Sequence, residues 1–418
     1  MPGPSTLRVA LLSYRGNPYS GGQGVYVRHL SAALARLGHA VTVFSGQPYP
    51  DLVDGVSLVR VPSLDLYRPD DPFRTPRPGE FRDWIDALEF ATLCTAGFPE
   101  PLTFSLRVRR LLLADRNGFD IVHDNQGLGW GLVSLERAGI PMVASVHHAV
   151  VFDRDLELLR ATNPARRLVL RRWYHFHRMQ DRVARRMQRV ITVSEQSRRD
   201  IVARMRIDPS RIRVVAVAVD ETVFAPQPAV PRVPGRIFAV ASADVPLKGV
   251  VPLLHAVARL RRSREVELVL LGEARPGGAV ERTVRDLELN GSVRFVRGID
   301  DLEVVRHYAE AEVAVVPSLY EGFSIPALQA MFCAVPLVAT TAGALPEVAG
   351  RDGETALLVA PGDAVALAQA IGRLLDDAPL RHRLSEAALL RSRERYSWAA
   401  SARATVEVYR EVLAIRRT

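Results

Sequence analysis

Short apolar runs alternate with helical patterns along the first part of the chain. Residues 7–13 form an apolar run of the length expected for a buried strand. After a glycine-rich turn, apolar residues recur every three or four positions over 27–37, which predicts a helix that ends at Gly38. A second strand is predicted at 41–44. Strand, glycine turn, helix and strand in this order form a βαβ unit, which is typical of a parallel sheet.

Later apolar runs extend this sheet. Strands are predicted at 120–123, 142–146 and 190–193. The intervening stretch 48–104 is rich in proline and aromatic residues, so we expect an insertion of loops and short helices there.

A second alternation of strands and helices follows a proline-rich linker at 226–234. It begins with a strand over 236–241 and a helix over 249–261. Further elements are predicted as strands at 267–271, 293–296, 313–316 and 336–339, and as a last helix at 398–415. Two similar α/β halves joined by one linker predict a ligand cleft between them.

Composition narrows the class of protein. The chain has 418 residues, of which 48% are hydrophobic and 24% charged, which fits two or three globular domains and excludes general disorder. No run approaches the roughly 20 apolar residues that span a bilayer, and the first residues lack a basic signal region. Cys94 and Cys333 form neither a disulfide framework nor a metal-ligand spacing. We therefore expect a cytoplasmic protein.

The positive charge is concentrated in one segment. Lysine and arginine number 55, and Lys248 is the single lysine. Residues 160–189 hold ten arginines and one aspartate, a surplus that equals the net charge of +9 of the whole chain. Because a general nucleic-acid binder spreads its basic surface more widely, we expect no nucleic-acid partner.

The arginine-rich segment 166–189 is predicted to be one helix. Its apolar residues form one stripe and its arginines lie opposite, at 100° per residue. Two interpretations stay open. The helix either packs its stripe in the core with a solvated basic face, or it contacts an anionic membrane at the inner face of the bilayer.

Two segments could carry chemistry. The turn around Gly22 places backbone amides at a helix N-terminus, where they favour an anion such as a phosphate. An ordinary βα turn is the alternative, and the absence of the full GxGxxG fingerprint argues against a dehydrogenase. In the second half, a strand ends near Pro317 and a helix begins around Pro326. The turn between them directs the Glu321 carboxylate and several amides to the carboxyl edge of the sheet.

These segments resemble the retaining glycosyltransferases of the GT4 family. Glu321-Gly-Phe with a polar residue eight positions on, Gln329, is similar to the family's E-x7-E signature. The segments that match in the same order are the Gly22 turn and helix, Thr192–Glu195, Pro246–Gly249, Ala339–Glu347 and Asp352–Val359. The resemblance covers nearly the whole chain except 48–104.

The resemblance implies an α/β protein with the GT-B fold, in which two Rossmann-like parallel-sheet domains face each other across a cleft. We expect an acceptor-side domain at 1–222, which includes the insertion 48–104. A nucleotide-sugar domain is expected at 223–395. The helix at 396–418 is expected to return to the first domain.

The implied activity is transfer of a hexosyl or related group, with retained anomeric configuration, from a UDP- or GDP-type sugar to an acceptor hydroxyl. His147, Glu321 and Lys248 match the family's catalytic positions. Glu321 binds the sugar hydroxyls, Lys248 binds the diphosphate, and His147 lies near the reacting sugar. A hydrogen-bonded histidine at a strand end is the alternative for His147.

Donor binding is assigned by the same resemblance. The predicted donor-binding residues are Gly22, Gly322, Phe323, Ser324, Ile325, Gln329 and Ile299. The amides of 322–325 match those around the sugar and diphosphate, and backbone groups around Ile299 match those at the base. No cofactor and no metal is expected, and Asp153-Arg-Asp155 is interpreted as a chance DxD.

The chain departs from the family pattern at several positions. Gln329 replaces the second acid, Ala243 replaces the arginine five residues before the lysine, and Ala218 replaces the asparagine of a hinge turn. Phe332 stands where a small residue is expected. A weakly active or non-catalytic GT-B binding protein therefore stays open, and so does a GT-B nucleotide-sugar epimerase.

The sequence does not identify the acceptor. The family places acceptors on the first half, and aromatic faces stack on sugars, so one or two of the eight aromatic residues in 48–104 are expected to line the acceptor site. A lipid or a small-molecule glycoside would fit these expectations.

Overall fold

The computed structural model describes residues 6–17, 22–68 and 70–415. The chain folds into two compact units. Unit 1 comprises the residues up to 193, residues 197–216 and the segment from 398 onward, and unit 2 comprises 194–196 and 217–397.

Unit 1 contains a seven-stranded sheet in which all pairs are parallel, in the order β3-β2-β1-β4-β5-β6-β7. Its strands are β1 (Arg8–Ser13), β2 (Ala40–Ser45), β3 (Val56–Arg60), β4 (Ile121–Asn125), β5 (Met142–Ser145), β6 (Arg189–Thr192) and β7 (Ile212–Val214). The chain moves outward from β1 to β3 and then returns to the other side of β1 with β4. Loops that leave β1 and β4 therefore diverge, which creates the switch point where such sheets bind ligands.

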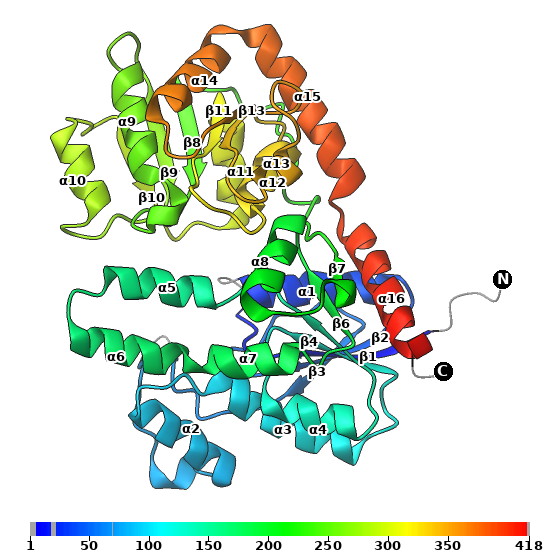
Figure 1. Cartoon of the computed structure of the whole chain (residues 1–418). Helices are drawn as coiled ribbons and strands as arrows, with labels where there is room; N and C mark the ends of the chain where they lie inside the picture. The colour runs from blue at the N-terminus through cyan, green and yellow to red at the C-terminus, as the bar shows by residue number, and fades with distance from the viewer. Residues whose placement is uncertain (1–5, 18–21, 69, 416–418) are drawn as a thin grey trace. The chain divides into compact units, whose positions relative to one another are not determined.

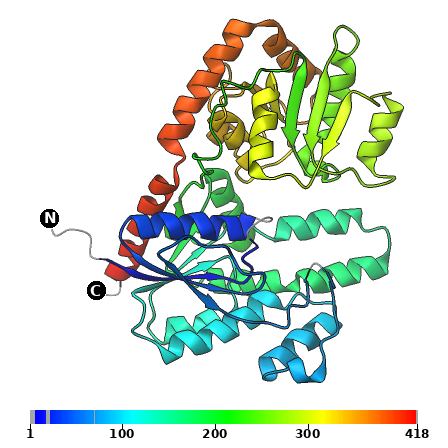
Figure 2. The ribbon, with the colours of Figure 1, turned by 180° about the vertical axis from the view of Figure 1, so that it is seen from behind.

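Helices cover both faces of this sheet. They are α1 (Gly22–Arg36), α2 (Trp84–Cys94), α3 (Glu100–Ala114), α4 (Trp130–Arg137), α5 (Val151–Arg160), α6 (Pro164–Trp173), α7 (His177–Ala184), α8 (Glu195–Met205) and α16 (Trp398–Ile415). Helix α1 lies on one face, where it packs against α16, and α3 packs against α4 on the other face (Figures 1 and 2).

The insertion holds more regular structure than its composition indicates. The sequence prediction of loops and short helices for 48–104 missed the edge strand β3, which pairs in register with β2. The short helices that it predicted are present as α2, a helix of 11 residues, and the start of α3. The search for continuous apolar runs does not detect β3, because this edge strand is only half buried and lacks such a run.

The prediction of one helix over 166–189 is wrong. Helix α6 ends at Trp173, a 3₁₀ turn covers Tyr174–Phe176, and α7 ends at Ala184. Arg189 belongs to β6, where it forms an ion pair with Glu411 at 2.6 Å. The predicted basic face is therefore divided between two helices, a turn and a strand.

Unit 2 contains a six-stranded parallel sheet in the order β10-β9-β8-β11-β12-β13. Its strands are β8 (Arg236–Val240), β9 (Glu267–Leu271), β10 (Val293–Val296), β11 (Val313–Val316), β12 (Leu337–Thr340) and β13 (Leu357–Val359). The strand order reverses between β8 and β11, so this sheet has a second switch point.

The helices of unit 2 bury a separate core. They are α9 (Val250–Leu260), α10 (Ala279–Asp286), α11 (Asp301–Glu310), α12 (Ile325–Phe332), α13 (Leu345–Ala349), α14 (Ala364–Asp376) and α15 (Ala378–Arg395). Helix α9 packs against α14, and the apolar faces of both join the sheet's buried side chains in one cluster. Over the described part of the chain, no helix is long and apolar enough to cross a bilayer.

Candidate functional site

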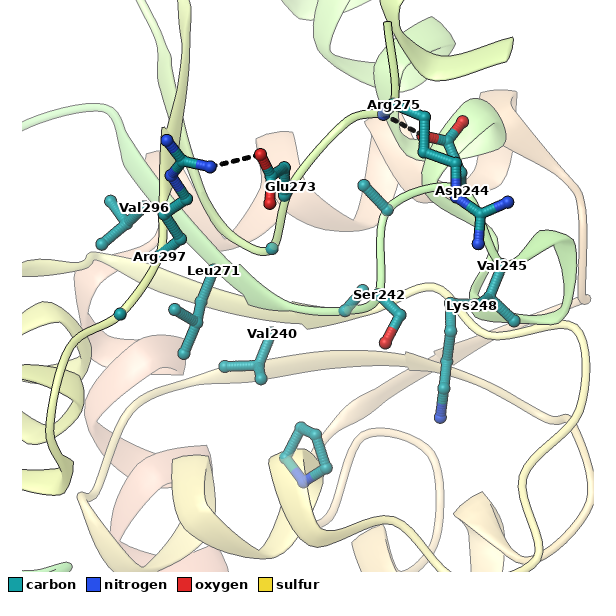
Figure 3. A pocket seen from close by; sticks show the side chains of 15 residues that line it. Val240, Ser242, Asp244, Val245, Lys248, Leu271, Glu273, Arg275, Val296 and Arg297 are labelled. Carbon is teal, nitrogen blue, oxygen red and sulfur yellow. Dashed lines mark hydrogen bonds and ion pairs between the residues drawn. The ribbon is translucent and has the colours of Figure 1, made fainter. Parts of the chain in front are cut away.

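A cavity of about 560 Å³ lies in unit 2 at the carboxyl ends of β8, β9 and β10 (Figure 3). Its walls are formed by residues 240–245, Lys248, residues 271–273, Arg275, residues 296–298 and Pro326. Pro326 brings the start of α12 into the wall, next to the strand-order reversal. The cavity therefore lies where an open α/β sheet binds its ligand.

Glycine at position 249 fixes the loop that carries Lys248. Gly249 has a φ of +66°, and a Cβ built on it would lie 1.9 Å from the carbonyl oxygen of Pro317. Only glycine allows this backbone conformation and this close approach. The loop is also tied to the end of β11, because the amide of Leu319 donates to the carbonyl of Leu247 at 2.7 Å. Lys248 is thus held beside the turn that follows β11.

The structure brings two of the predicted catalytic residues together. Nζ of Lys248 lies 2.8 Å from Oε1 of Glu321, and the hydroxyl of Ser318 donates to the same oxygen at 2.8 Å. Glu321 is buried, whereas the Lys248 side chain is about one third exposed. Burying a carboxylate costs free energy unless it is paired and hydrogen-bonded, and both kinds of partner are present here.

The turn after Glu321 is set by its backbone. The carbonyl of Glu321 accepts from the amide of Ala344 at 2.9 Å, and a Cβ at Gly343 would lie 2.1 Å from that oxygen. Ser324 has a φ of +155° and caps α12 by accepting from the amide of Ala327. This conformation ends the turn that contains Gly322, and α12 begins at the next residue, Ile325.

Phe323 and Gln329 have different environments. The Phe323 ring is buried and packs edge-on against Tyr396, with centroids 5.9 Å apart. A donor contact from Phe323 would therefore come from its backbone. Gln329 lies half-buried on α12, one turn beyond Ile325. Ile299 follows the cavity-lining Gly298 but is not itself part of the wall.

The rest of the cavity wall carries further charges. Arg297 forms an ion pair with Glu273 (Figure 3). Asp244 accepts hydrogen bonds from the backbone amides of Arg275 and Val280, so its carboxylate anchors the β9–α10 loop. Ala243 lines the cavity with a methyl group and contributes no charge.

His147 lies in unit 1, just after β5. Its Nε2 is 2.7 Å from Oδ1 of Asn125, and its backbone amide donates to Oε1 of Gln126 at 2.7 Å. An amide oxygen only accepts, so Nε2 carries the proton and Nδ1 has a free lone pair. Burial, together with the neighbouring His148, lowers the pKa of His147 to about 4. The imidazole is therefore neutral at pH 7.

A buried hydrogen-bonded chain lies behind His147, and the sequence did not reveal it. Tyr409 of α16 bonds Nδ1 of His123 at 2.7 Å, and Nε2 of His123 bonds the Ser145 hydroxyl at 2.7 Å. Ser145 is in turn 3.3 Å from the hydroxyl of Tyr26, whose ring packs edge-on against His147. Burial lowers the pKa of His123 to about 3. This series of hydrogen bonds connects α16 to the Tyr26 ring that packs against His147.

The remaining predicted positions lie on α1 and α5. Gly22 begins α1, and residues 18–21 of the preceding turn lie outside the described residues. Asp153 pairs with His148 at 2.8 Å, and Asp155 pairs with Arg154 at 2.7 Å. Within the described ranges, no group of three or more His, Cys, Asp or Glu side chains could hold a metal ion.

Family comparisons cover both halves of the chain. Residues 20–223 match the family described as Glycosyltransferase Family 4, and residues 234–377 match the one described as Glycosyl transferases group 1. An MMP alpha-(1->4)-mannosyltransferase of Mycolicibacterium hassiacum is 51% identical over 98% of this chain and 99% of its own length. A D-inositol 3-phosphate glycosyltransferase of Kineococcus radiotolerans is 30% identical over 98% and 96%.

Solved structures share the fold. Sucrose-phosphate synthase from Thermosynechococcus elongatus superposes with a TM-score of 0.73 at 24% identity, covering 98% of this chain and 100% of that one. Anabaena HepE in complex with UDP and glucose gives 0.68 at 16% identity, over 96% and 98%. The matching segments, the two parallel sheets and the identity to characterised transferases agree, and the chain belongs to the GT4 family of GT-B glycosyltransferases.

Proposed function

We propose that this protein is a retaining α-mannosyltransferase that makes an α-(1→4) linkage, with a nucleoside diphosphate mannose as donor and a sugar hydroxyl as acceptor. The observation that carries the proposal is the 51% identity to the M. hassiacum mannosyltransferase over nearly the full length of both chains. Relatives that act on inositol phosphate are only about 30% identical or less, so the mannosyl reaction is favoured over theirs.

The donor would lie in the cavity of unit 2. Glu321 accepts hydrogen bonds from the mannose hydroxyls, and the amides of 322–325 bind around the sugar and diphosphate. Lys248 supplies a compact positive charge to the diphosphate, whose negative charge grows as it leaves. Lys248 and Glu321 are paired at 2.8 Å. Donor binding would therefore separate them, with Lys248 on the diphosphate and Glu321 on the sugar.

The proposed reaction needs no metal and no separate cofactor. The bond from the mannose anomeric carbon to the diphosphate oxygen breaks, and a bond from that carbon to the acceptor oxygen forms on the same face. The acceptor proton goes to the departing diphosphate. Neutral His147 would act near the reacting sugar as a hydrogen-bonding group, which fits its low pKa.

An assay with defined substrates tests the proposal. The protein is incubated with GDP-mannose or UDP-sugars and a short α-mannoside acceptor, and the products are separated by chromatography and analysed by NMR. We expect one new α-(1→4)-linked mannose per donor consumed, with the Glu321→Gln variant as the inactive control. Product formation without acceptor would indicate an epimerase. Absence of any product would favour a non-catalytic binding protein.

We also propose peripheral contact with an anionic membrane through α5 and α6. Leu159 and Leu168 are 83% and 68% exposed, and Arg166, Arg167 and Arg171 are exposed on α6. Apolar side chains beside cations are the combination that binds anionic interfaces. In a flotation assay with vesicles containing anionic lipid, the protein should rise with the vesicles. A variant with Leu168 and the three arginines replaced by serine should stay behind, and equal recovery would contradict the proposal.

A further inference from the structure

Three cationic side chains line the cavity of unit 2, and they differ in whether an acidic side chain is paired with them. Lys248 is engaged by the buried carboxylate of Glu321. Arg297 is engaged by Glu273, which lines the same wall. The guanidinium of Arg275 has no hydrogen-bond or ion-pair partner among the residues that the structure describes. It is the one uncompensated cation of this cavity wall, within those residues.

The loop that carries Arg275 is held firmly although its side chain is exposed. The amide of Arg275 donates to the Asp244 carboxylate, and its carbonyl accepts from the amide of Gly278 at 2.8 Å. The Asp244 carboxylate thereby accepts hydrogen bonds from backbone amides and does not pair with the Arg275 guanidinium. The backbone of Arg275 is therefore fixed by hydrogen bonds, whereas its guanidinium is available to bind a ligand.

Arg275 also lies in a loop that packs beside Ala243, the uncharged position of the cavity wall. A Cβ at Gly272 would lie 2.1 Å from the carbonyl oxygen of Ala241 and 3.5 Å from the amide of Ala243, so the loop after β9 packs directly on the loop after β8. Figure 3 shows the Arg275 side chain turned toward Val245 and Lys248, away from the Glu273–Arg297 pair. At position 243 the wall offers only a methyl group.

We propose that Arg275 binds the diphosphate of the nucleotide donor together with Lys248. A diphosphate carries more negative charge than one ammonium offsets, and a guanidinium presents planar paired donors that match phosphate oxygens. The cation comes from the β9–α10 loop, since Ala243 cannot provide it from the loop after β8. The proposal rests on the proposed function only for the identity of the ligand, a nucleoside diphosphate.

Calorimetric titration of the full chain with GDP, UDP and the matching nucleosides tests this inference. Arg275→Gln should weaken binding of the preferred nucleoside diphosphate by about tenfold to 100-fold, the range for a charge-assisted hydrogen bond. Binding of the nucleoside alone should not change, because it carries no phosphate. Arg275→Lys should fall between, and Arg285→Gln on the exposed face of α10 is the matched control and should bind like the wild type.

The outcomes separate this inference from the proposed function. Arg275→Gln binding the diphosphate within about twofold of wild type would overturn the role of Arg275, whether or not mannose is transferred. Wild type that binds the diphosphate through Arg275 but transfers no mannose would overturn the proposed function alone. Unchanged thermal unfolding of Arg275→Gln without ligand excludes misfolding as the cause of weaker binding.

Discussion

Nζ of Lys248 lies 2.8 Å from Oε1 of Glu321, and this ion pair joins the loop after β8 to the turn after β11. The two strands are neighbours in the sheet, on either side of the point where the strand order reverses. The pair therefore bridges the two loops at the switch point, with Lys248 in the cavity wall and Glu321 behind it. Its two members have separate roles in the proposed reaction, but in the absence of donor each is the other's partner.

Replacing Lys248 should affect both stability and activity. In Lys248→Met, the buried Glu321 carboxylate keeps, among the described residues, only the Ser318 hydroxyl as a hydrogen-bond partner, so the free energy of unfolding should fall by about 1–3 kcal/mol. Mannosyl transfer should fall by at least about 100-fold, as for removal of a charge that stabilises a leaving group. Urea unfolding and initial rates measure the two effects. Ser318→Ala is the control, since it removes the neutral partner and leaves the ion pair, and it should cost about 1 kcal/mol. Wild-type rates in Lys248→Met would contradict the assignment.

Gly249 should tolerate no side chain. In Gly249→Ala, the new Cβ would lie 1.9 Å from the Pro317 carbonyl oxygen, so the loop must move. We expect the free energy of unfolding to fall by more than about 2 kcal/mol, with weaker nucleotide binding because Lys248 moves with the loop. Gly277→Ala is a matched control, because Gly277 has a φ of +68° but nothing within 4 Å of its Cβ position. That variant should cost only about 1 kcal/mol. Equal losses in the two variants would show that backbone strain, not the close approach, explains the effect.

Local pattern predicted the buried strands, and the family resemblance singled out Lys248 and Glu321, but neither predicted that these two side chains pair with each other. Predicted strands such as 267–271 and 313–316 coincide with β9 and β11, since a parallel strand covered on both faces is a continuous apolar run. Edge strands β3 and β7 were missed because they are partly exposed. The helix over 166–189 was predicted from periodicity alone, which does not register a 3₁₀ turn at Tyr174–Phe176.

Parts of the candidate site depend on contacts between segments that are distant in the sequence, and the spacing of residues along the chain does not predict such contacts. Arg275 is one of 54 arginines, and only the fold shows that it lines the cavity and that its guanidinium has no ion-pair partner among the described residues. The chain from Tyr409 through His123 to Ser145 joins residues up to 286 positions apart. A weak signal was present, since a histidine in a buried strand such as β4 needs a hydrogen-bond partner.

His123 should make stability depend on pH. Its pKa in the folded protein is about 3, below its ordinary value of 6.5, because burial disfavours the charged form. Between these values the unfolded chain binds a proton that the folded chain does not, so stability falls as pH falls below 6.5. Between pH 7 and pH 5 this one group should lower the free energy of unfolding by about 2 kcal/mol. Urea unfolding of wild type and His123→Asn at both pH values isolates this term, because other groups titrate equally in the two proteins. The same pH dependence in both would show that His123 does not cause it.

Asn125 should keep His147 neutral. The neutral amide oxygen of Asn125 accepts from Nε2 at 2.7 Å and offers no negative charge to stabilise an imidazolium. In Asn125→Asp, a carboxylate takes that place and should raise the pKa of His147 from about 4 toward its ordinary value or above. If neutral His147 serves the reaction, kcat/KM of the variant should decline at acid pH, with an inflection between about pH 6 and pH 7, and recover toward pH 8. Wild type should show no inflection from His147 above pH 5. NMR titration of the imidazole C–H signals gives the pKa independently, and Asn125→Ser, a neutral variant, should not raise it. A raised pKa with an unchanged rate profile would remove His147 from the reaction, whereas an unchanged pKa would show that Asn125 does not control its charge.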